Sequence, residues 1–345
     1  MPRMLKSSLA STFAVLFSIC ALICPTNAQV PETHAVTVTV VTADGKPVTN
    51  LQSQNIRVRD HGVQVKSLSL DSSPRRIVLL IDASPSMGIS NGKVTLLQAA
   101  VHSAGLFLSR VPRVDLISVH MFAENDQEIV PFTHDFGSIW AAIAGMSKPQ
   151  VEKSKDGNLP STNLNGALNS VLAILSEHPQ FGDSIVIFSD GLFPRSGQGD
   201  ILNFYEQPEY LRAILPKLGT LGVRVFFSLA GNVALTPPLH GVEVFIGAAG
   251  GESFELRDSA PPAFGANNPY NRPAPPIYRT NSLEERAVAL SAAIQNVYHL
   301  ELEFEKPLKK PMPLHLEVVD ERGKALRSMT VLSPESVYPD AGLSH

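Results

Sequence analysis

Three oxygen-bearing side chains follow one apolar run in the first third of the chain. Asp82, Ser84 and Ser86 stand at alternate positions directly after the run 77–81. The length and β-branched content of this run predict a strand buried on both faces. Ligands bind at the carboxyl ends of strands in open α/β sheets, so a turn here can direct all three side chains to one point. Hard cations such as Mg²⁺ prefer oxygen ligands, and the spacing therefore indicates a metal site.

Two hydroxyls and one carboxylate are too few for an octahedral cation, so other parts of the chain must contribute. Thr162 opens a predicted amphipathic helix, and Asp190 ends a second predicted buried strand before Gly191. Each piece alone is common: Asp-x-Ser-x-Ser is often a solvated turn, Thr is an ordinary helix N-cap, and Asp-Gly is an ordinary turn. Their combination and order favour a single divalent-cation site.

These five residues resemble the metal-ion-dependent adhesion site of the von Willebrand factor A domain. That site has an Asp-x-Ser-x-Ser loop, a distant Thr and a more distant Asp followed by Gly. The resemblance covers roughly residues 76–297 and implies a doubly wound, mostly parallel sheet flanked by helices. It also implies two kinds of ligand for Mg²⁺ (or Mn²⁺ or Ca²⁺). Direct ligands would be Ser84, Ser86 and Thr162, and ligands acting mostly through bound water would be Asp82 and Asp190.

A mostly neutral set of ligands leaves a cation with much of its positive charge and an open position. Such a site attracts a carboxylate of a protein partner, which favours a binding module over an enzyme. Two alternatives stay open: an envelope scaffold with a structural metal, and, more remotely, a Mg²⁺-dependent phosphohydrolase. The haloacid type of phosphohydrolase needs Asp-x-Asp, and position 84 is Ser, so the general acid/base is missing. Neither Gly-x-Ser-x-Gly nor His-Glu-x-x-His occurs in the chain.

Charge and composition narrow the classes further. The 345 residues carry a formal net charge of −4, and no basic cluster is interleaved with aromatic residues. This pattern argues against a nucleic-acid partner. The sequence leaves the oligomeric state, the protein ligand and the metal actually bound open.

Residues 1–28 have the pattern of an export signal. Arg3 and Lys6 precede a largely apolar run at 9–24, and small residues at 26–28 mark a cleavage site before Gln29. The run is shorter than the ~20 residues that a membrane-spanning helix needs. We therefore expect a periplasmic or extracellular protein without a transmembrane anchor after cleavage. Both cysteines lie in this segment, so the mature chain would have no disulfide.

The rest of the chain divides by pattern into three segments. Residues 75–297 alternate strands with helices, as in a mostly parallel sheet. Residues 29–74 and 298–345 instead show short alternating strands, too few on either side to form a stable sheet alone. We expect the two to pair into one antiparallel β module. The segment 44–51, Asp-Gly-Lys-Pro-Val-Thr-Asn-Leu, is also similar to the β preface of the secreted acidobacterial VWFA-related domain family.

Several local expectations can be compared directly with a structure. They are a helix at 92–109 with Val94 on its buried face, a strand at 114–122, a helix at 210–221 that kinks or restarts at Pro216, and no packed element in the proline-rich stretch 258–280. We also expect His120 to be a core histidine, and the acidic residues Glu124, Asp126 and Glu128 to form a solvated hairpin.

The last helix, predicted at 282–297, runs without a spacer into a strand at 298–304. The resemblance leaves two alternatives for it. In integrin-type A domains the corresponding helix slides when a ligand closes the metal shell, and here such movement would pull on the β module. Alternatively, packing of its apolar face locks the helix as a strut.

Overall fold

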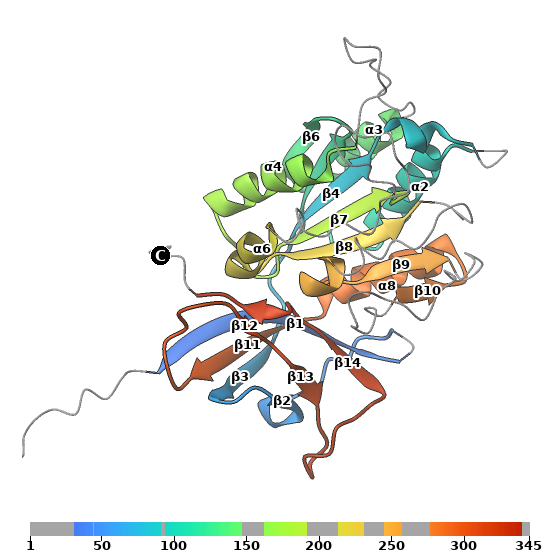
Figure 1. Cartoon of the computed structure of the whole chain (residues 1–345). Helices are drawn as coiled ribbons and strands as arrows, with labels where there is room; N and C mark the ends of the chain where they lie inside the picture. The colour runs from blue at the N-terminus through green and yellow to red at the C-terminus, as the bar shows by residue number, and fades with distance from the viewer. Residues whose placement is uncertain are drawn as a thin grey trace, which may run out of the picture.

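The computed structural model describes the greater part of the chain in seven stretches. They are residues 31–43, 45–90, 94–146, 162–191, 213–230, 245–256 and 277–339. The predicted export signal and most of the proline-rich stretch lie outside these residues. The described chain forms two parts, a helix-flanked sheet and a smaller group of antiparallel strands (Figure 1).

The larger part is built on a seven-stranded sheet with the order β10-β9-β8-β7-β4-β5-β6. Only β6 runs antiparallel to its neighbour; the other pairings are parallel. β4 is an interior strand between β7 and β5, and all seven of its residues are buried. The strands are β4 (Arg76–Asp82), β5 (Leu116–Phe122), β6 (Asp126–Thr133), β7 (Ser184–Ser189), β8 (Arg224–Leu229), β9 (Ser253–Leu256) and β10 (Ile277–Thr280).

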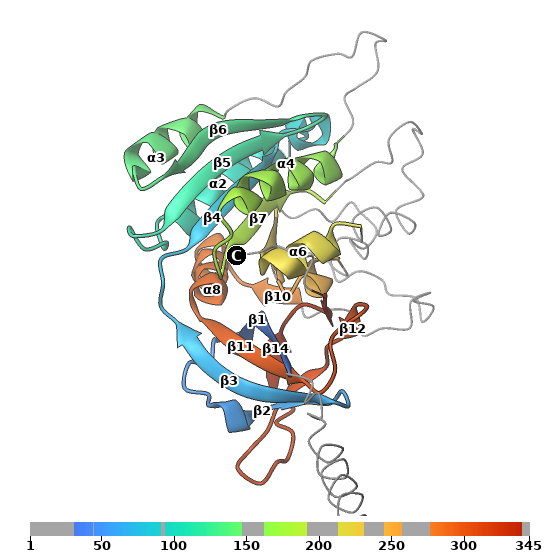
Figure 2. The ribbon, with the colours of Figure 1, turned by 90° about the vertical axis from the view of Figure 1, so that its left-hand side faces the viewer.

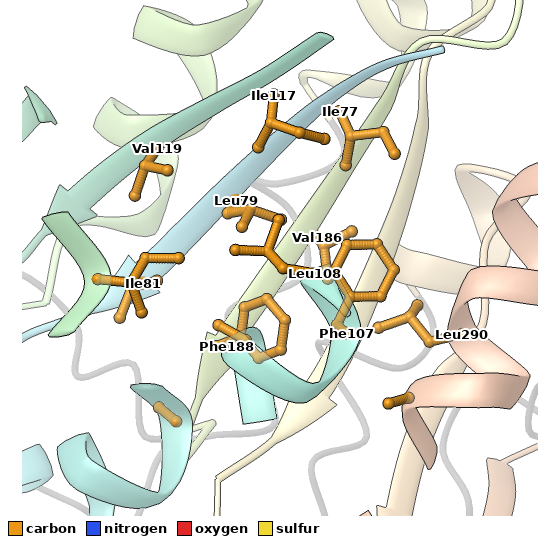
Figure 3. Close-up of a cluster of buried hydrophobic side chains, with 14 of the residues drawn as sticks. Ile77, Leu79, Ile81, Phe107, Leu108, Ile117, Val119, Val186, Phe188 and Leu290 are labelled. Carbon is orange, nitrogen blue, oxygen red and sulfur yellow. The ribbon is translucent and has the colours of Figure 1, made fainter. Parts of the chain in front are cut away.

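Helices cover both faces of this sheet because β4 alternates its side chains between two cores. Ile77, Leu79 and Ile81 pack toward α2 (Leu96–Leu108), α3 (Phe136–Gly145) and α8 (Leu283–Gln295). Figure 3 shows this core, with Phe107 of α2 and Leu290 of α8 beside the sheet. Val78 and Leu80 pack toward α4 (Leu164–Glu177) and α6 (Leu215–Leu221). The predicted α/β class with a mostly parallel, helix-flanked sheet is confirmed.

The smaller part is a four-stranded antiparallel sheet that joins the two ends of the described chain. Its order is β14-β1-β11-β3, and β1 pairs with β11 from Glu32↔Phe304 to Val38↔Tyr298. The strands are β1 (Glu32–Thr42), β3 (Val63–Asp71), β11 (Val297–Phe304) and β14 (Met329–Leu332). The expected pairing of the N- and C-terminal segments into one antiparallel module is therefore confirmed.

Short elements close the core of this β module. β2 (Ile56–Val58) pairs with β13 (Leu316–Val318), and β12 (Met312–Pro313) pairs with β15 (Ser336–Val337). A single turn of 3₁₀ helix, η1 (Ser53–Asn55), leads into β2. Aliphatic and aromatic side chains from both ends of the chain fill one shared core, including Val38, Leu300 and Phe304.

The chain passes between the two parts at β3–β4 and at α8–β11, as Figure 2 shows. α8 runs into β11 with only Asn296 between them. Side-chain contacts add to this junction. Thr39 of β1 donates to the Ala293 carbonyl of α8 at 3.2 Å, and Phe181 stacks on His299 with ring centroids 4.1 Å apart. The module is thus joined to the larger part by packing and hydrogen bonds as well as by the chain.

Some expected boundaries were wrong. α2 begins at Leu96 because Thr95 and Gln98 form a capping box, and Val94 is 42% exposed, so it does not lie on the buried face. β5 starts at Leu116, and Val114 before it is exposed. α6 begins at Leu215 with Pro216 in its first turn, which agrees with the expected restart at Pro216 and not with a kink; residues 210–212 of the expected helix lie outside the described residues.

The proline-rich stretch ends in an element that the sequence did not predict. Residues Ile277–Thr280 form β10, which pairs in parallel with β9 at the sheet edge. The remainder of the stretch lies outside the described residues. Within the described ranges, no helix is both long and apolar enough to span a bilayer.

Candidate metal site

Asp82 ends the interior strand β4 and is fully buried. Its Oδ1 accepts a hydrogen bond from the Ser84 backbone N–H at 2.8 Å, which folds the chain back over the strand end. The Ser84 and Ser86 hydroxyls lie 3.1 Å apart and share a hydrogen bond. Met87, wholly buried in the core, anchors the short 3₁₀ helix η2 (Pro85–Gly88) that follows. The structure thus brings the three predicted oxygen ligands of this loop together.

Asp190 follows β7, the neighbour of β4, and is also fully buried. The register pairs Ile81 with Phe188, so the ends of the two strands lie side by side. Gly191 then turns the chain with a φ of +77°, a left-handed conformation that a residue with a Cβ adopts only at a cost. The Asp-Gly pair therefore has a specific role here: the glycine allows the turn that keeps Asp190 at the strand end.

Thr162 reaches the same edge of the sheet through its neighbours. The Asn163 N–H donates to the Ala123 carbonyl at 2.7 Å, just beyond the end of β5. The Ala83 N–H, next to Asp82, donates to the Phe122 carbonyl at 2.8 Å. These two bonds place Thr162, which is 7% exposed, beside the loop after β5 and near the end of β4. The helix cap is Asn163, whose side chain accepts from the Gly166 N–H, so the expectation that Thr162 starts the helix was wrong by one residue.

The electrostatics of this edge are dominated by carboxylates. The pKa of Asp82 is raised to about 7, first because burial removes it from water and second because Asp190 lies close by. Hydrogen bonds from Ser189 and Ser84 oppose this rise. Two buried carboxylates that disfavour each other's charge, with hydroxyl oxygens beside them, form an oxygen-rich set of ligands with excess negative charge. Such a set fits a hard divalent cation.

Ser189 is a residue of this site that the sequence analysis missed. It is fully buried, and its hydroxyl donates to Asp82 Oδ2 at 2.6 Å. It also accepts from the Gly191 N–H at 3.0 Å. The sequence did contain an indication of this residue, because Ser189 directly precedes Asp190 at the predicted strand end. A buried hydroxyl there must find partners, and the end of β4 is the nearest place.

The other polar residues considered in the sequence, His120, Glu124, Asp126 and Glu128, are not part of the predicted metal site. His120 is buried in β5, as expected of a core histidine, and its Nδ1 lies 3.1 Å from Asp126 Oδ2. Asp126 is therefore mostly buried and paired, in contrast to the expected solvated hairpin, whereas Glu124 and Glu128 are exposed. Among the described residues no group of three or more His, Cys, Asp and Glu side chains could hold a metal ion. The predicted site contains only two residues of those types.

Comparison with known families agrees with this architecture. Residues 77–192 match the family model of the von Willebrand factor type A domain, a range that contains all five predicted ligands. Residues 77–192 are thus similar to a von Willebrand factor type A domain, a class consistent with protein interaction or adhesion. A comparison with curated proteins finds no match.

Several solved structures are similar to this chain at low identity. A von Willebrand factor type A protein from Catenulispora acidiphila is 11% identical with a TM-score of 0.44, over 92% of this chain and 76% of that one. An aerotolerance-related membrane protein from Bacteroides fragilis is 15% identical with a TM-score of 0.41, over 64% of this chain and 98% of that one. The conserved hypothetical protein BatB from Bacteroides thetaiotaomicron is 18% identical with a TM-score of 0.35, over 45% of this chain and 65% of that one.

Proposed function

We propose that this protein binds a divalent cation at the carboxyl edge of its central sheet and uses it to bind a carboxylate of a protein partner. The observation that carries the proposal is the meeting of two buried carboxylates, Asp82 and Asp190, with the hydroxyls of Ser84 and Ser86. Burying one charged carboxylate is costly, and two that raise each other's pKa favour a compensating charge. The class of the domain, which is consistent with protein interaction, agrees with this role.

The residues divide into two groups by their chemistry. Ser84, Ser86 and Thr162 offer neutral hydroxyl oxygens as direct ligands. Asp82 already accepts hydrogen bonds on both of its oxygens, from the Ser84 N–H and the Ser189 hydroxyl. This fits a role outside the direct ligands, in which Asp82 holds water around the ion. When bound, Mg²⁺ or Mn²⁺ would supply positive charge and an open position for a partner's carboxylate.

Calorimetric titration with Mg²⁺ and Mn²⁺ tests the cation site. We expect the wild type to bind one ion, Asp82→Ala and Asp190→Ala to bind none measurably, and Ser84→Ala to bind more weakly with an unchanged fold. Asp135→Ala is the matched control, since it removes a carboxylate that caps α3 instead. Equal affinity in the wild type and in Asp82→Ala would refute the site.

Binding to a panel of envelope and extracellular proteins, with and without chelator, tests the partner. We expect at least one partner to bind only with the cation present and to be lost when its acidic side chain is replaced. If the cation binds but every interaction survives chelation, the metal is structural, and the scaffold role is the correct one. We place this protein among binding modules and not among enzymes because its cation ligands are mostly hydroxyls.

We further propose that the protein is exported to the periplasm or beyond and belongs to the acidobacterial VWFA-related type. Support comes from the pattern of residues 1–28 and from the segment 44–51. N-terminal sequencing of the secreted form should begin at Gln29. A mature protein that retains Met1, or that reacts with thiol reagents, would contradict cleavage because both cysteines lie before the cut.

A further inference from the structure

Ser189 connects the two loops that carry the predicted aspartates. It is the last residue of β7, and its side chain crosses to Asp82 at the end of β4. Its Oγ donates to Asp82 Oδ2 at 2.6 Å and accepts from the Gly191 N–H at 3.0 Å. A hydroxyl has one proton, and an amide N–H can only donate. The Ser189 proton is therefore committed to Asp82, and the direction of both bonds is fixed.

The same bonds fix the orientation of the Asp82 carboxylate. Oδ1 accepts from the Ser84 N–H at 2.8 Å on one loop, and Oδ2 accepts from Ser189 on the other. With one oxygen held on each side, the carboxylate cannot rotate without breaking a buried hydrogen bond. The chain from Gly191 through Ser189 to Asp82 also sets how far the Asp190 turn lies from the Ser84 loop.

We propose that Ser189 is a positioning residue for the cation site, a role that rests on the proposed function. It holds no ion itself. It orients Asp82 and keeps the loop of Ser84 and the turn of Asp190 in the register that a small, strictly octahedral cation needs. Hydrogen-bond partners of metal ligands commonly change affinity by about 10–100-fold when they are removed. A cation that tolerates irregular geometry, such as Ca²⁺, should depend on Ser189 less than Mg²⁺ does.

A matched control exists on the same strand. Ser184 begins β7, is also fully buried, and donates to the Gly182 carbonyl at 3.1 Å. Ser184→Ala removes a hydroxyl that is as buried as that of Ser189, but at the opposite end of the strand. Ser189→Ala and Ser184→Ala should therefore cost similar stability in chelator, and only Ser189→Ala should affect the cation site. Ser189→Cys, of nearly equal size but with a weak donor, serves as a second variant with little change in packing.

The experiment is calorimetric titration of the full mature chain with Mg²⁺ and with Ca²⁺. We expect Ser189→Ala and Ser189→Cys to lose about 10–100-fold in Mg²⁺ affinity and less in Ca²⁺ affinity, with Ser184→Ala within twofold of wild type. Unchanged Mg²⁺ affinity in either Ser189 variant, while Asp82→Ala abolishes binding, overturns the role of Ser189 and leaves the site intact. Equal losses for both cations also overturn it. Absence of binding in the wild type refutes the proposed function and this inference together.

Discussion

The two edges of the central sheet differ in how their buried charged groups are paired. At the amino edge lie three arginines, Arg75, Arg76 and Arg224, that are at most 8% exposed. At the carboxyl edge lie the fully buried carboxylates of Asp82 and Asp190. The difference between the edges lies in their partners. The arginines find acceptors within the chain, whereas the hydrogen bonds that Asp82 receives from the described residues come from a hydroxyl and an amide.

The amino edge is balanced in a way that joins the two parts of the molecule. Arg75 pairs with Asp71 of β3, and Arg76 pairs with Asp183 before β7. Arg224 instead donates to the Ala293 and Ile294 carbonyls, both at 3.2 Å, at the end of α8. The C-terminal end of a helix carries partial negative charge, which suits a guanidinium with several donors.

Arg224 also reaches the β module. It donates to the Thr39 hydroxyl of β1 at 2.6 Å, so one guanidinium connects the sheet, the last helix and the module. Burial, and secondly the nearby Arg75, lower the pKa of Arg224 to about 9, which still leaves it charged at neutral pH. The comparison shows that the buried arginines at the amino edge have carboxylate and carbonyl partners in the same chain, and we infer that these contacts stabilise the fold. For the buried charge at the carboxyl edge, our proposal is that a cation from outside would balance it.

The largest expected effect comes from removing a charge that is balanced. Arg224→Met fills similar volume but leaves the Ala293 and Ile294 carbonyls and Thr39 without their donor. We expect a loss of about 3–5 kcal/mol in the free energy of unfolding, measured by urea denaturation. Arg59→Ala, which removes an exposed arginine, should leave stability nearly unchanged. A loss for Arg224→Met no larger than that for Arg59→Ala would show that the amino edge does not hold the fold together.

The same substitution should have opposite effects at the two edges. In chelator, Asp183→Asn should destabilise by about 3 kcal/mol because Arg76 loses its partner. Asp82→Asn should instead leave the chain as stable as wild type or more stable, since it removes a carboxylate that disfavours Asp190. With Mg²⁺ at ~100 times its dissociation constant, wild type should gain about 2.7 kcal/mol, and Asp82→Asn none. Destabilisation of both variants in chelator would contradict the contrast.

Sequence patterns predicted the elements that depend on local periodicity. The apolar run of β4 and the strand β7 lie where expected, and so do the oxygens of Asp82, Ser84 and Ser86. The predicted boundaries were wrong where a side-chain hydrogen bond, and not the apolar pattern, sets the end of an element. Val94 fits the apolar face of a helix, but the capping box at Thr95 starts the helix after it.

Long-range partners could not be predicted from sequence. β10 lacks an apolar pattern long enough to stand out among prolines, and it is a strand because β9 offers an edge to pair with. Nothing local marks Arg224 as buried, since an arginine usually lies at the surface and only the end of α8 makes burial tolerable here. Ser189 likewise gains its role from Asp82, more than a hundred residues away in the chain.

Glu252 offers a third case, a carboxylate at the amino edge. It precedes β9, is 4% exposed, and burial raises its pKa to about 8 from 4.5. The folded state therefore binds this proton more tightly than the unfolded state does. Its contribution to stability is greatest below pH 4.5 and is lost as pH rises toward about 8.

The side chain of Glu252→Gln is neutral at every pH, so this variant should not lose stability as the pH rises from 4.5 toward about 8. We expect the variant to match wild type near pH 5 and to exceed it by about 3 kcal/mol near pH 7, at about 1.4 kcal/mol for each pH unit. Urea denaturation across this range measures the difference, and the other carboxyls cancel because both proteins carry them. A difference that does not vary with pH would mean that Glu252 is charged in the folded state and has a partner.

The smallest expected effect concerns coupling between the edges. Thr39→Val keeps the shape of the side chain but removes its bonds to Arg224 and to the Ala293 carbonyl, at a cost of about 1–2 kcal/mol. α8 is held by Arg224 at its end and by Leu290 and Ile294 in the core. If these contacts fix the helix in one position, removing its hydrogen bond to β1 should not change the geometry of the cation site. We therefore expect Mg²⁺ affinity within twofold of wild type. Linkage is reciprocal, so a helix with two positions would respond differently: the substitution would change Mg²⁺ affinity, and Mg²⁺ would change hydrogen exchange in β1. A changed Mg²⁺ affinity, or a changed hydrogen exchange in β1 on adding Mg²⁺, would show that the β module and the proposed cation site are thermodynamically coupled.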